Sequence, residues 1–149
     1  MRHLFASDLH LSGDRPAMAA AFTAFLSSLR PDDRLYLLGD VFDYWIGDDD
    51  LDDAFNQRMV QAMALATMRG VQLQLMHGNR DFLLGARFCQ ASGVRLLPDL
   101  QRLQIDQEAV LLCHGDLLCT DDVAYQQFRA QVRTPQWAAQ FQARALSER

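Results

Sequence analysis

A chain of 149 residues is long enough for one domain with a hydrophobic core and too short for two domains of ordinary size. Half of its residues are hydrophobic and 22% are charged, which is the balance of a globular protein. The net charge of -5 argues against a protein that binds nucleic acid through its charge, so we expect no nucleic-acid partner. No apolar run is long enough to cross a bilayer, and the first residues lack a basic segment followed by an apolar one, so we expect a cytosolic or peripheral location.

Apolar strands and amphipathic helices are predicted to alternate along the first hundred residues. Residues 2–7 predict a strand, and residues 16–29 predict a helix that begins at a proline, which fits the first turn of a helix. A strand at Leu35 and a helix over residues 54–69 follow. The next expected elements are a strand over 71–76, a short helix over 86–92 and a strand over 94–97. Gly70 and Gly93 are placed to end the second and third helices, and this alternation is typical of an α/β fold.

The last third of the chain changes its pattern. A strand over residues 100–105 is expected to turn back into a further strand that begins at Val110. The periodicity then becomes helical, first over residues 123–132 and again after Pro135. We expect the last helix to continue to the chain terminus, because no glycine or proline interrupts it. Its apolar residues are Trp137, Phe141 and Ala145.

Four of the predicted strands end at residues that bind metal ions. The strands run, in chain order, into Asp8 with His10, into Asp40, into Asn79 and into His114. Ligands gather at the carboxyl ends of strands in α/β sheets, so we expect these side chains to lie together. Carboxylate, amide and imidazole donors suit hard divalent ions such as Mn²⁺ or Mg²⁺. One such strand ending could arise by chance, but four of them predict a metal site.

These five residues are too few to complete the coordination of two ions, but they can form part of a two-ion site. Two catalytic ions lie about 3.5–4 Å apart, so one carboxylate must bridge them. Asp40 is the expected bridge, because its strand lies between the other two parallel strands in sequence order. The two ions would be held by the remaining pairs, Asp8 with His10 and Asn79 with His114. The acidic loop with Asp43, Asp48, Asp49 and Asp50 could add ligands, but we favour a solvated turn with a helix cap for it.

Other side chains near these motifs have less specific interpretations. Arg80 follows Asn79, where a phosphate would lie, and its guanidinium suits a phosphate. Tyr44 and Trp45 could stack on a base or a sugar, but packing of aromatic side chains after a strand is the commoner outcome. His77 is interpreted as a structural histidine at a strand end.

Four short motifs occur in a fixed order along the chain. They are Asp8-Leu9-His10, Gly39-Asp40-Val41-Phe42-Asp43, Gly78-Asn79-Arg80-Asp81 and His114-Gly115-Asp116. In order and spacing they resemble the calcineurin-like metallophosphoesterases over nearly the whole chain. The finer pattern over residues 39–49, 78–83 and 114–122 is similar to the branch of that family that hydrolyses UDP-2,3-diacylglucosamine in lipid A synthesis.

The resemblance implies a fold, an activity and a set of residue roles. The fold would be an α/β/β/α sandwich, incomplete at the C-terminus, with its core over residues 1–121 and the start of a helical lid over residues 122–149. Water activated by two Mn²⁺ ions would cleave the lipid diphosphate into UMP and 2,3-diacylglucosamine 1-phosphate. The protein would act in the cytoplasm, peripherally on the inner membrane. The catalytic residues would be Arg80, Asn79 and His114, and the substrate would contact Asn79, Arg80 and Asp122.

In one respect the sequence departs from the family pattern. Family members continue beyond the position of Arg149 and supply a Gly-His-Thr-His motif, whose two histidines ligate one ion each. Two alternatives therefore stay open: another metallophosphoesterase that acts on nucleotides or phosphoproteins, and a truncated, non-catalytic fragment. Relatives of the first kind carry Asp-Arg-Gly after the bridging aspartate and a histidine after the asparagine, and this chain has neither. The sequence gives no indication of the oligomeric state.

Overall fold

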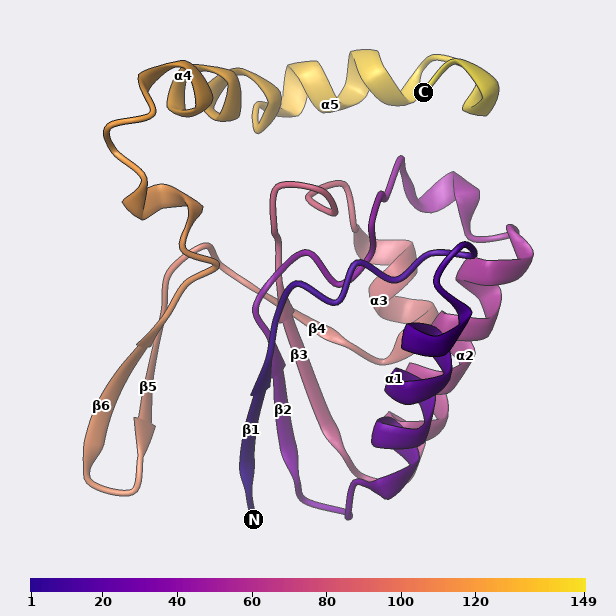
Figure 1. The fold of residues 1–149 in the computed structure, drawn as a ribbon, viewed down its shortest axis with the longest axis vertical. Helices are drawn as coiled ribbons and strands as arrows, with labels where there is room; N and C mark the ends of the chain where they lie inside the picture. Colours follow the sequence, from indigo (N-terminus) through magenta and orange to yellow (C-terminus); the bar gives the residue numbers. More distant parts are fainter.

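A four-stranded parallel sheet runs through the centre of the computed structural model, which describes residues 1–149 (Figure 1). Its strands are β1 (His3–Ala6), β2 (Arg34–Leu37), β3 (Gln72–Met76) and β4 (Arg95–Leu97). They pair in the order β1-β2-β3-β4, and each pair is parallel. β2 therefore lies between β1 and β3 in space as well as in sequence, and all carboxyl ends meet at one edge of the sheet.

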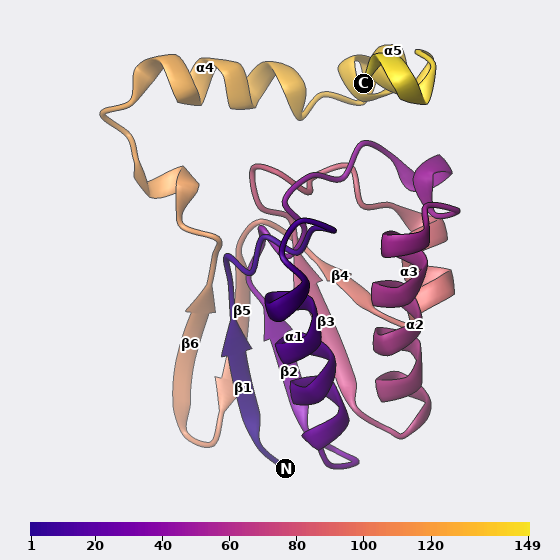
Figure 2. The ribbon, with the colours of Figure 1, turned by 45° about the vertical axis from the view of Figure 1, so that its right-hand side comes forward.

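Three helices cover one face of this sheet (Figure 2). They are α1 (Pro16–Ser28), α2 (Ala54–Met68) and α3 (Ala86–Ser92). Pro16 opens α1, and Asp53 caps α2 by accepting hydrogen bonds from the backbone N–H groups of Phe55 and Asn56. Gly93 ends α3 with a left-handed φ of 72°. The predicted starts and stops of these helices are confirmed. The core between helices and sheet includes Leu35, Leu37, Phe42, Met63, Leu75 and Phe88.

An antiparallel hairpin packs against the other face of the sheet. It consists of β5 (Gln101–Ile105) and β6 (Glu108–Leu112), which form a sheet of their own. A smaller core joins the two sheets and contains Tyr36, Met76, Leu97 and Leu112. The α/β class is confirmed, and these are three layers of the expected α/β/β/α sandwich. No helix covers the outer face of the hairpin, where Arg102, Gln104 and Leu111 are exposed.

Two further helices lie across the carboxyl ends of the strands (Figures 1 and 2). They are α4 (Val123–Val132) and α5 (Pro135–Gln142). The prediction that the last helix continues to the chain terminus is wrong, because α5 ends at Gln142 and a 3₁₀ turn follows over Leu146–Glu148. The reason is that the Arg149 guanidinium donates to the carbonyl groups of Gln142 and Arg144, which satisfies acceptors that a longer helix would use. None of the helices combines the length and the apolar character that spanning a membrane requires.

Two methionines of α2 provide a test of this core. Met63 is fully buried under the sheet, whereas Met68, in the same helix, is 82% exposed. We expect Met63→Ala to lower the free energy of unfolding by about 2–5 kcal/mol, because it removes buried apolar volume and leaves a cavity. Met68→Ala should change it by less than about 0.5 kcal/mol. Urea unfolding followed by circular dichroism measures both, and equal losses would contradict the assignment of the core face of α2.

Candidate metal centre

The loops that follow β1 and β2 run side by side beyond the ends of the strands. The backbone N–H of Asp8 donates to the carbonyl of Gly39 at 3.1 Å, and that of His10 donates to the carbonyl of Asp40 at 3.0 Å. These bonds extend the pairing of the two strands past their last residues. They bring the first two predicted ligand positions next to the third.

All three of these ligand positions have an unusual backbone conformation. The φ angles of Asp8, His10 and Asp40 are 55°, 47° and 50°, in the left-handed region. Residues with a Cβ rarely occupy this region, and the conformation costs on the order of 1–3 kcal/mol for each residue. Such strain clusters at functional sites, where surrounding contacts hold the backbone in place.

Two glycines allow the loops to approach one another. A Cβ on Gly78 would lie 2.1 Å from Oδ1 and 2.2 Å from the backbone nitrogen of Asp40. A Cβ on Gly39, whose φ is 92°, would lie 2.6 Å from Nδ1 of His114. No side chain fits at either position, so glycine is required where the loop after β3 meets the loop after β2.

A buried aspartate ties the same two loops together. The Asp81 carboxylate accepts hydrogen bonds from the backbone N–H groups of Gly78 and Val41, both at 2.8 Å, and from that of Asp40 at 3.2 Å. Burial raises the pKa of Asp81, and the backbone donors act against that rise. Asp81 is therefore a positioning residue. In the sequence, Asp81 is visible only as a member of a motif, because nothing in the local pattern separates it from the exposed aspartates.

The predicted ligands converge at the edge of the sheet. Asp8, Asp40 and His114 each offer an atom that lies within 4.8 Å of the other two. His114 Nδ1–H donates to the carbonyl of Leu38 at 2.7 Å. Its Nε2 lies 3.0 Å from Oδ1 of Asn79 and 3.8 Å from Oδ2 of Asp40. The histidine reaches this point from the end of β6, which belongs to the hairpin and not to the parallel sheet.

These side chains fit a cation. A neutral His114 with its hydrogen on Nδ1 has only a lone pair on Nε2, and the oxygens that face it, on Asn79 and Asp40, carry no hydrogen either. Electron pairs that face one another in this way are stabilised by a positive ion among them. An imidazole whose other nitrogen donates to a backbone carbonyl is also the usual form of a metal-binding histidine.

The opposite side of the cluster gives a second indication that these side chains fit a cation. His10 Nδ1 is buried and has no hydrogen-bond partner, although Oδ1 of Asp43 lies 3.5 Å away. Its Nε2 lies 3.9 Å from Oδ1 of Asp8. A buried ring nitrogen without a partner is costly, and a bound ion would remove that cost. The donor set, all oxygen and imidazole nitrogen, is of the kind that hard divalent ions prefer.

Arg80 borders this cluster. Its backbone N–H donates to Oδ1 of Asp40 at 2.9 Å, and its Nη1 lies 3.4 Å from Oδ1 of Asp43. The guanidinium lies over the ring of Tyr44, which is 68% exposed. Trp45, by contrast, is buried, so the interpretation of packing is confirmed for it. Asp43 departs from the predicted solvated turn, because it lies between His10 and Arg80.

The remaining candidates lie outside the cluster. Asp48 accepts hydrogen bonds from the backbone N–H groups of Gly85 and Phe88 at 3.0 Å each, so it caps α3. Asp122 caps α4, since it accepts from the N–H of Tyr125 at 3.0 Å.

The structural interpretation of His77 is confirmed. Its Nε2 donates to the carbonyl of Leu84 at 2.8 Å, and burial lowers its pKa.

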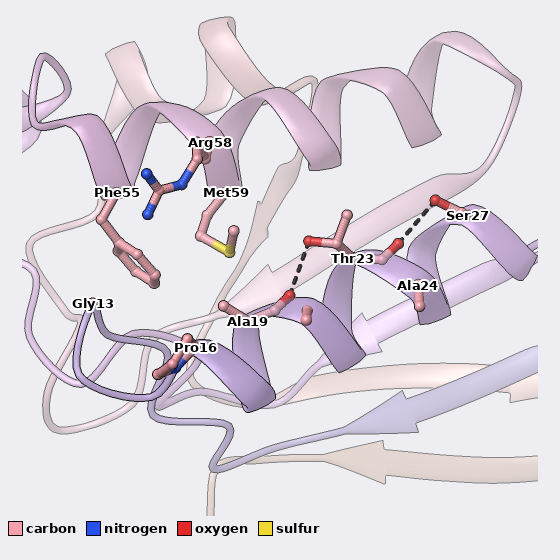
Figure 3. Close-up of a pocket in the computed structure, with 10 residues that line it drawn as sticks. Gly13, Pro16, Ala19, Thr23, Ala24, Ser27, Phe55, Arg58 and Met59 are labelled. Carbon is pink, nitrogen blue, oxygen red and sulfur yellow. Dashed lines mark hydrogen bonds between the residues drawn. The ribbon is translucent and has the colours of Figure 1, made fainter.

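A groove of about 600 Å³ lies away from the cluster, between α1 and α2 (Figure 3). Small side chains line it on α1, and Phe55, Arg58 and Met59 line it on α2. None of the predicted ligands contributes to this groove, so it plays no part in the chemistry of the cluster.

Comparison with known proteins agrees with the arrangement. The sequence model described as Calcineurin-like phosphoesterase matches residues 1–148. A UDP-2,3-diacylglucosamine hydrolase of Haemophilus influenzae (strain PittGG) is 49% identical over 134 residues, which cover 89% of this chain and 56% of that protein. The enzyme of the same name from Aromatoleum aromaticum is 48% identical over 153 residues, which cover 100% of this chain and 61% of that protein. The chain thus spans between half and two thirds of the length of these curated relatives.

Among solved structures, a protein of unknown function from Aquifex aeolicus shares the fold. Its TM-score is 0.57 at 16% sequence identity, and the match covers 89% of this chain and 72% of that chain.

Because the loops approach each other closely, we expect the addition of one methyl group at Gly78 to destabilise the fold. Gly78→Ala should lower the free energy of unfolding by about 1–3 kcal/mol, because the new Cβ would overlap the backbone of Asp40. Gly13→Ala is the matched control, since a Cβ there meets nothing within 4 Å. Chemical denaturation of both variants measures the difference. A Gly78→Ala variant as stable as Gly13→Ala would show that the loops have room to separate.

Proposed function

The chain belongs to the calcineurin-like phosphoesterase family, and on that premise we propose that it hydrolyses the diphosphate bond of UDP-2,3-diacylglucosamine. The products would be UMP and 2,3-diacylglucosamine 1-phosphate, a step of lipid A biosynthesis. Relatives that are 48–50% identical carry the name of this substrate. The observation that carries the proposal is the convergence of Asp8, Asp40 and His114 at the carboxyl edge of the sheet, beside Arg80.

Two divalent cations, which we infer to be Mn²⁺, would be the cofactors. Asp40 is buried between the two halves of the cluster and is the proposed bridge. When bound, such ions lower the pKa of a water molecule and offset the charge of a phosphate. The two ions would be held by the pairs on either side of Asp40, Asp8 with His10 and Asn79 with His114.

Arg80, Asn79 and His114 would act on the substrate. The Arg80 guanidinium is partly exposed and beside the cluster, so it suits the binding of a phosphate oxygen pair. It stays charged at any working pH and therefore stabilises negative charge without donating a proton. The hydrogen bond from Nδ1–H of His114 to the carbonyl of Leu38 fixes the ring and directs its Nε2 toward Asn79.

The lipid part of the substrate would meet the helices beyond residue 121. We infer a core over residues 1–121 and a lid that begins at Asp122, the residue proposed to contact the substrate. Val123 and Phe128 expose 60% and 57% of their surface at the start of this lid, and Leu118, just before it, exposes 70%. An apolar surface of this kind suits acyl chains, and it supports peripheral association with the inner membrane from the cytoplasm.

The direct test is release of UMP from UDP-2,3-diacylglucosamine with Mn²⁺ present. It should be made on the chain itself and on a fusion to the part of the Aromatoleum aromaticum relative that the chain does not match. UMP release that is abolished by Arg80→Met supports the proposal. Proteins that bind Mn²⁺ and release no UMP in either form would contradict it.

The bridging position of Asp40 can be tested by comparing two aspartates. We expect Asp40→Asn to weaken Mn²⁺ binding by about tenfold or more, because one change weakens two sites. Asp43→Asn should have a smaller effect, since Asp43 contacts only His10 and Arg80. Isothermal titration with Mn²⁺ measures both affinities. Equal losses would refute the bridging assignment.

The chemistry of Arg80 predicts a substrate preference. An arginine cannot protonate a poor leaving group, so the reaction depends on a leaving group that is stable as an anion, such as UMP. We expect diphosphate esters to be cleaved at least about a hundredfold faster than simple alkyl monoesters, from the several kcal/mol of charge stabilisation on which the reaction relies. Parallel assays of the active form, with phosphate and UMP detection, measure the ratio. Faster cleavage of alkyl phosphates would overturn this role.

A further inference from the structure

Arg129 in helix α4 and Arg133, the residue that caps its C-terminal end, reach two of the loops of the candidate metal centre. Arg129 Nε donates to Oδ2 of Asp116 at 2.7 Å, and its Nη2 donates to Oδ2 of Asp99 at 2.7 Å. Asp116 lies two residues after His114 in the same loop. Burial opposes the charge of Asp116, but the hydrogen bonds from Tyr125 and Arg129 outweigh burial and hold its pKa below the usual range.

Arg133 holds the other loop. Its Nη2 donates to the carbonyl of Gly78 at 2.6 Å, next to Asn79 in the chain. Its Nη1 lies 3.7 Å from Oδ1 of Asp99, and its guanidinium lies over the ring of Phe82 at 4.9 Å from the centroid. Asp99 thus pairs with both arginines.

We propose that Arg129 and Arg133, joined through Asp99, form an arginine clamp that sets the separation of Asn79 and His114. The clamp would be a positioning device for one half of the metal centre, and it would make cation binding depend on the seating of α4. This inference rests on the proposed function, because it takes the cluster to be a metal centre.

The contacts favour this role over simple attachment of the helix. The two side chains are only 12% and 15% exposed, and burial of charged groups is costly where apolar contacts would serve. Each guanidinium divides its donors between one metal loop and the shared carboxylate of Asp99. The two loops touch through Nε2 of His114 and Oδ1 of Asn79, 3.0 Å apart. A change in the separation of the loops therefore acts directly on this contact.

The direction in which cation affinity changes when an arginine is removed distinguishes a positioning role from a purely electrostatic one. Both arginines are positive and lie near the cluster, so as charges they repel a cation. If they acted through charge alone, their removal would tighten cation binding. The clamp predicts the opposite, since the loss of either arginine releases one loop.

The experiment is a titration of the whole chain with Mn²⁺, observed by electron paramagnetic resonance. We expect Arg129→Met and Arg133→Met each to weaken binding by about tenfold, as is usual for lost partners of metal ligands. Arg133→Lys should recover part of that loss, because an ammonium group can donate to Gly78 but not span to Asp99 as well. A second readout uses the protein without metal: the ring resonances of His114 should shift in both methionine variants.

Two controls separate the clamp from general effects. Arg144→Met removes one positive charge just after the end of α5, where the Arg144 guanidinium lies over the ring of Phe141. Arg69→Met removes a similar guanidinium–carbonyl contact, to Leu26 at 2.7 Å, far from the cluster. We expect Arg144→Met to leave both readouts unchanged, and Arg69→Met to lower thermal stability without a change in Mn²⁺ affinity.

Each outcome has a distinct meaning. Unchanged or tighter Mn²⁺ binding in the two methionine variants overturns the clamp and leaves the proposed function standing. A wild-type chain that binds no Mn²⁺ contradicts the proposed metal centre. The His114 resonances then still decide whether the arginines position that side chain, and unshifted resonances overturn the clamp.

Discussion

The candidate metal centre depends on the hydrogen bonds that the buried Asp81 carboxylate accepts from two loops. Backbone N–H groups at the ends of parallel strands have lost their ladder partners, and a buried donor without a partner is costly. Asp81 satisfies four of them, on Gly78, Asp40, Val41 and Phe42. A single carboxylate thereby fixes the spacing between the second and third loops, and the first loop follows through its own bonds to the second.

The left-handed backbone conformations of Asp8, His10 and Asp40 are unfavourable in free energy, and the hydrogen bonds between the loops hold them in place. The strained conformations persist because hydrogen bonds on neighbouring loops leave the chain no relaxed alternative. The benefit is that the donor atoms are in place before any ligand arrives. Preorganised polar groups act without reorganisation during a reaction, which is how charged transition states are stabilised.

Much of the fold and of the candidate site is predictable from the sequence where local interactions determine the structure. Prediction fails where contacts between distant residues determine it. Local signals such as Pro16, Asp53 and Gly93 mark helix ends, because capping is a local interaction. The four strand ends predicted side chains that do lie together, although His114 reaches the cluster from a hairpin and not from the parallel sheet. The contacts of Asp81 and Arg133 join residues some forty or more positions apart, and no periodicity encodes such contacts. The end of α5 escapes prediction for a related reason, because Arg149, which donates to Gln142, is itself paired with Asp49, 100 positions away.

The cluster is assembled from four loops that are spread from residue 8 to residue 114. Its donor atoms therefore converge only after the non-local pairing of the parallel strands, the slow kind of contact in folding. In the unfolded chain the same groups are far apart and cannot share an ion. A cation that binds only the native arrangement stabilises the whole domain by mass action, so the stability of the fold becomes a function of the free concentration of that cation.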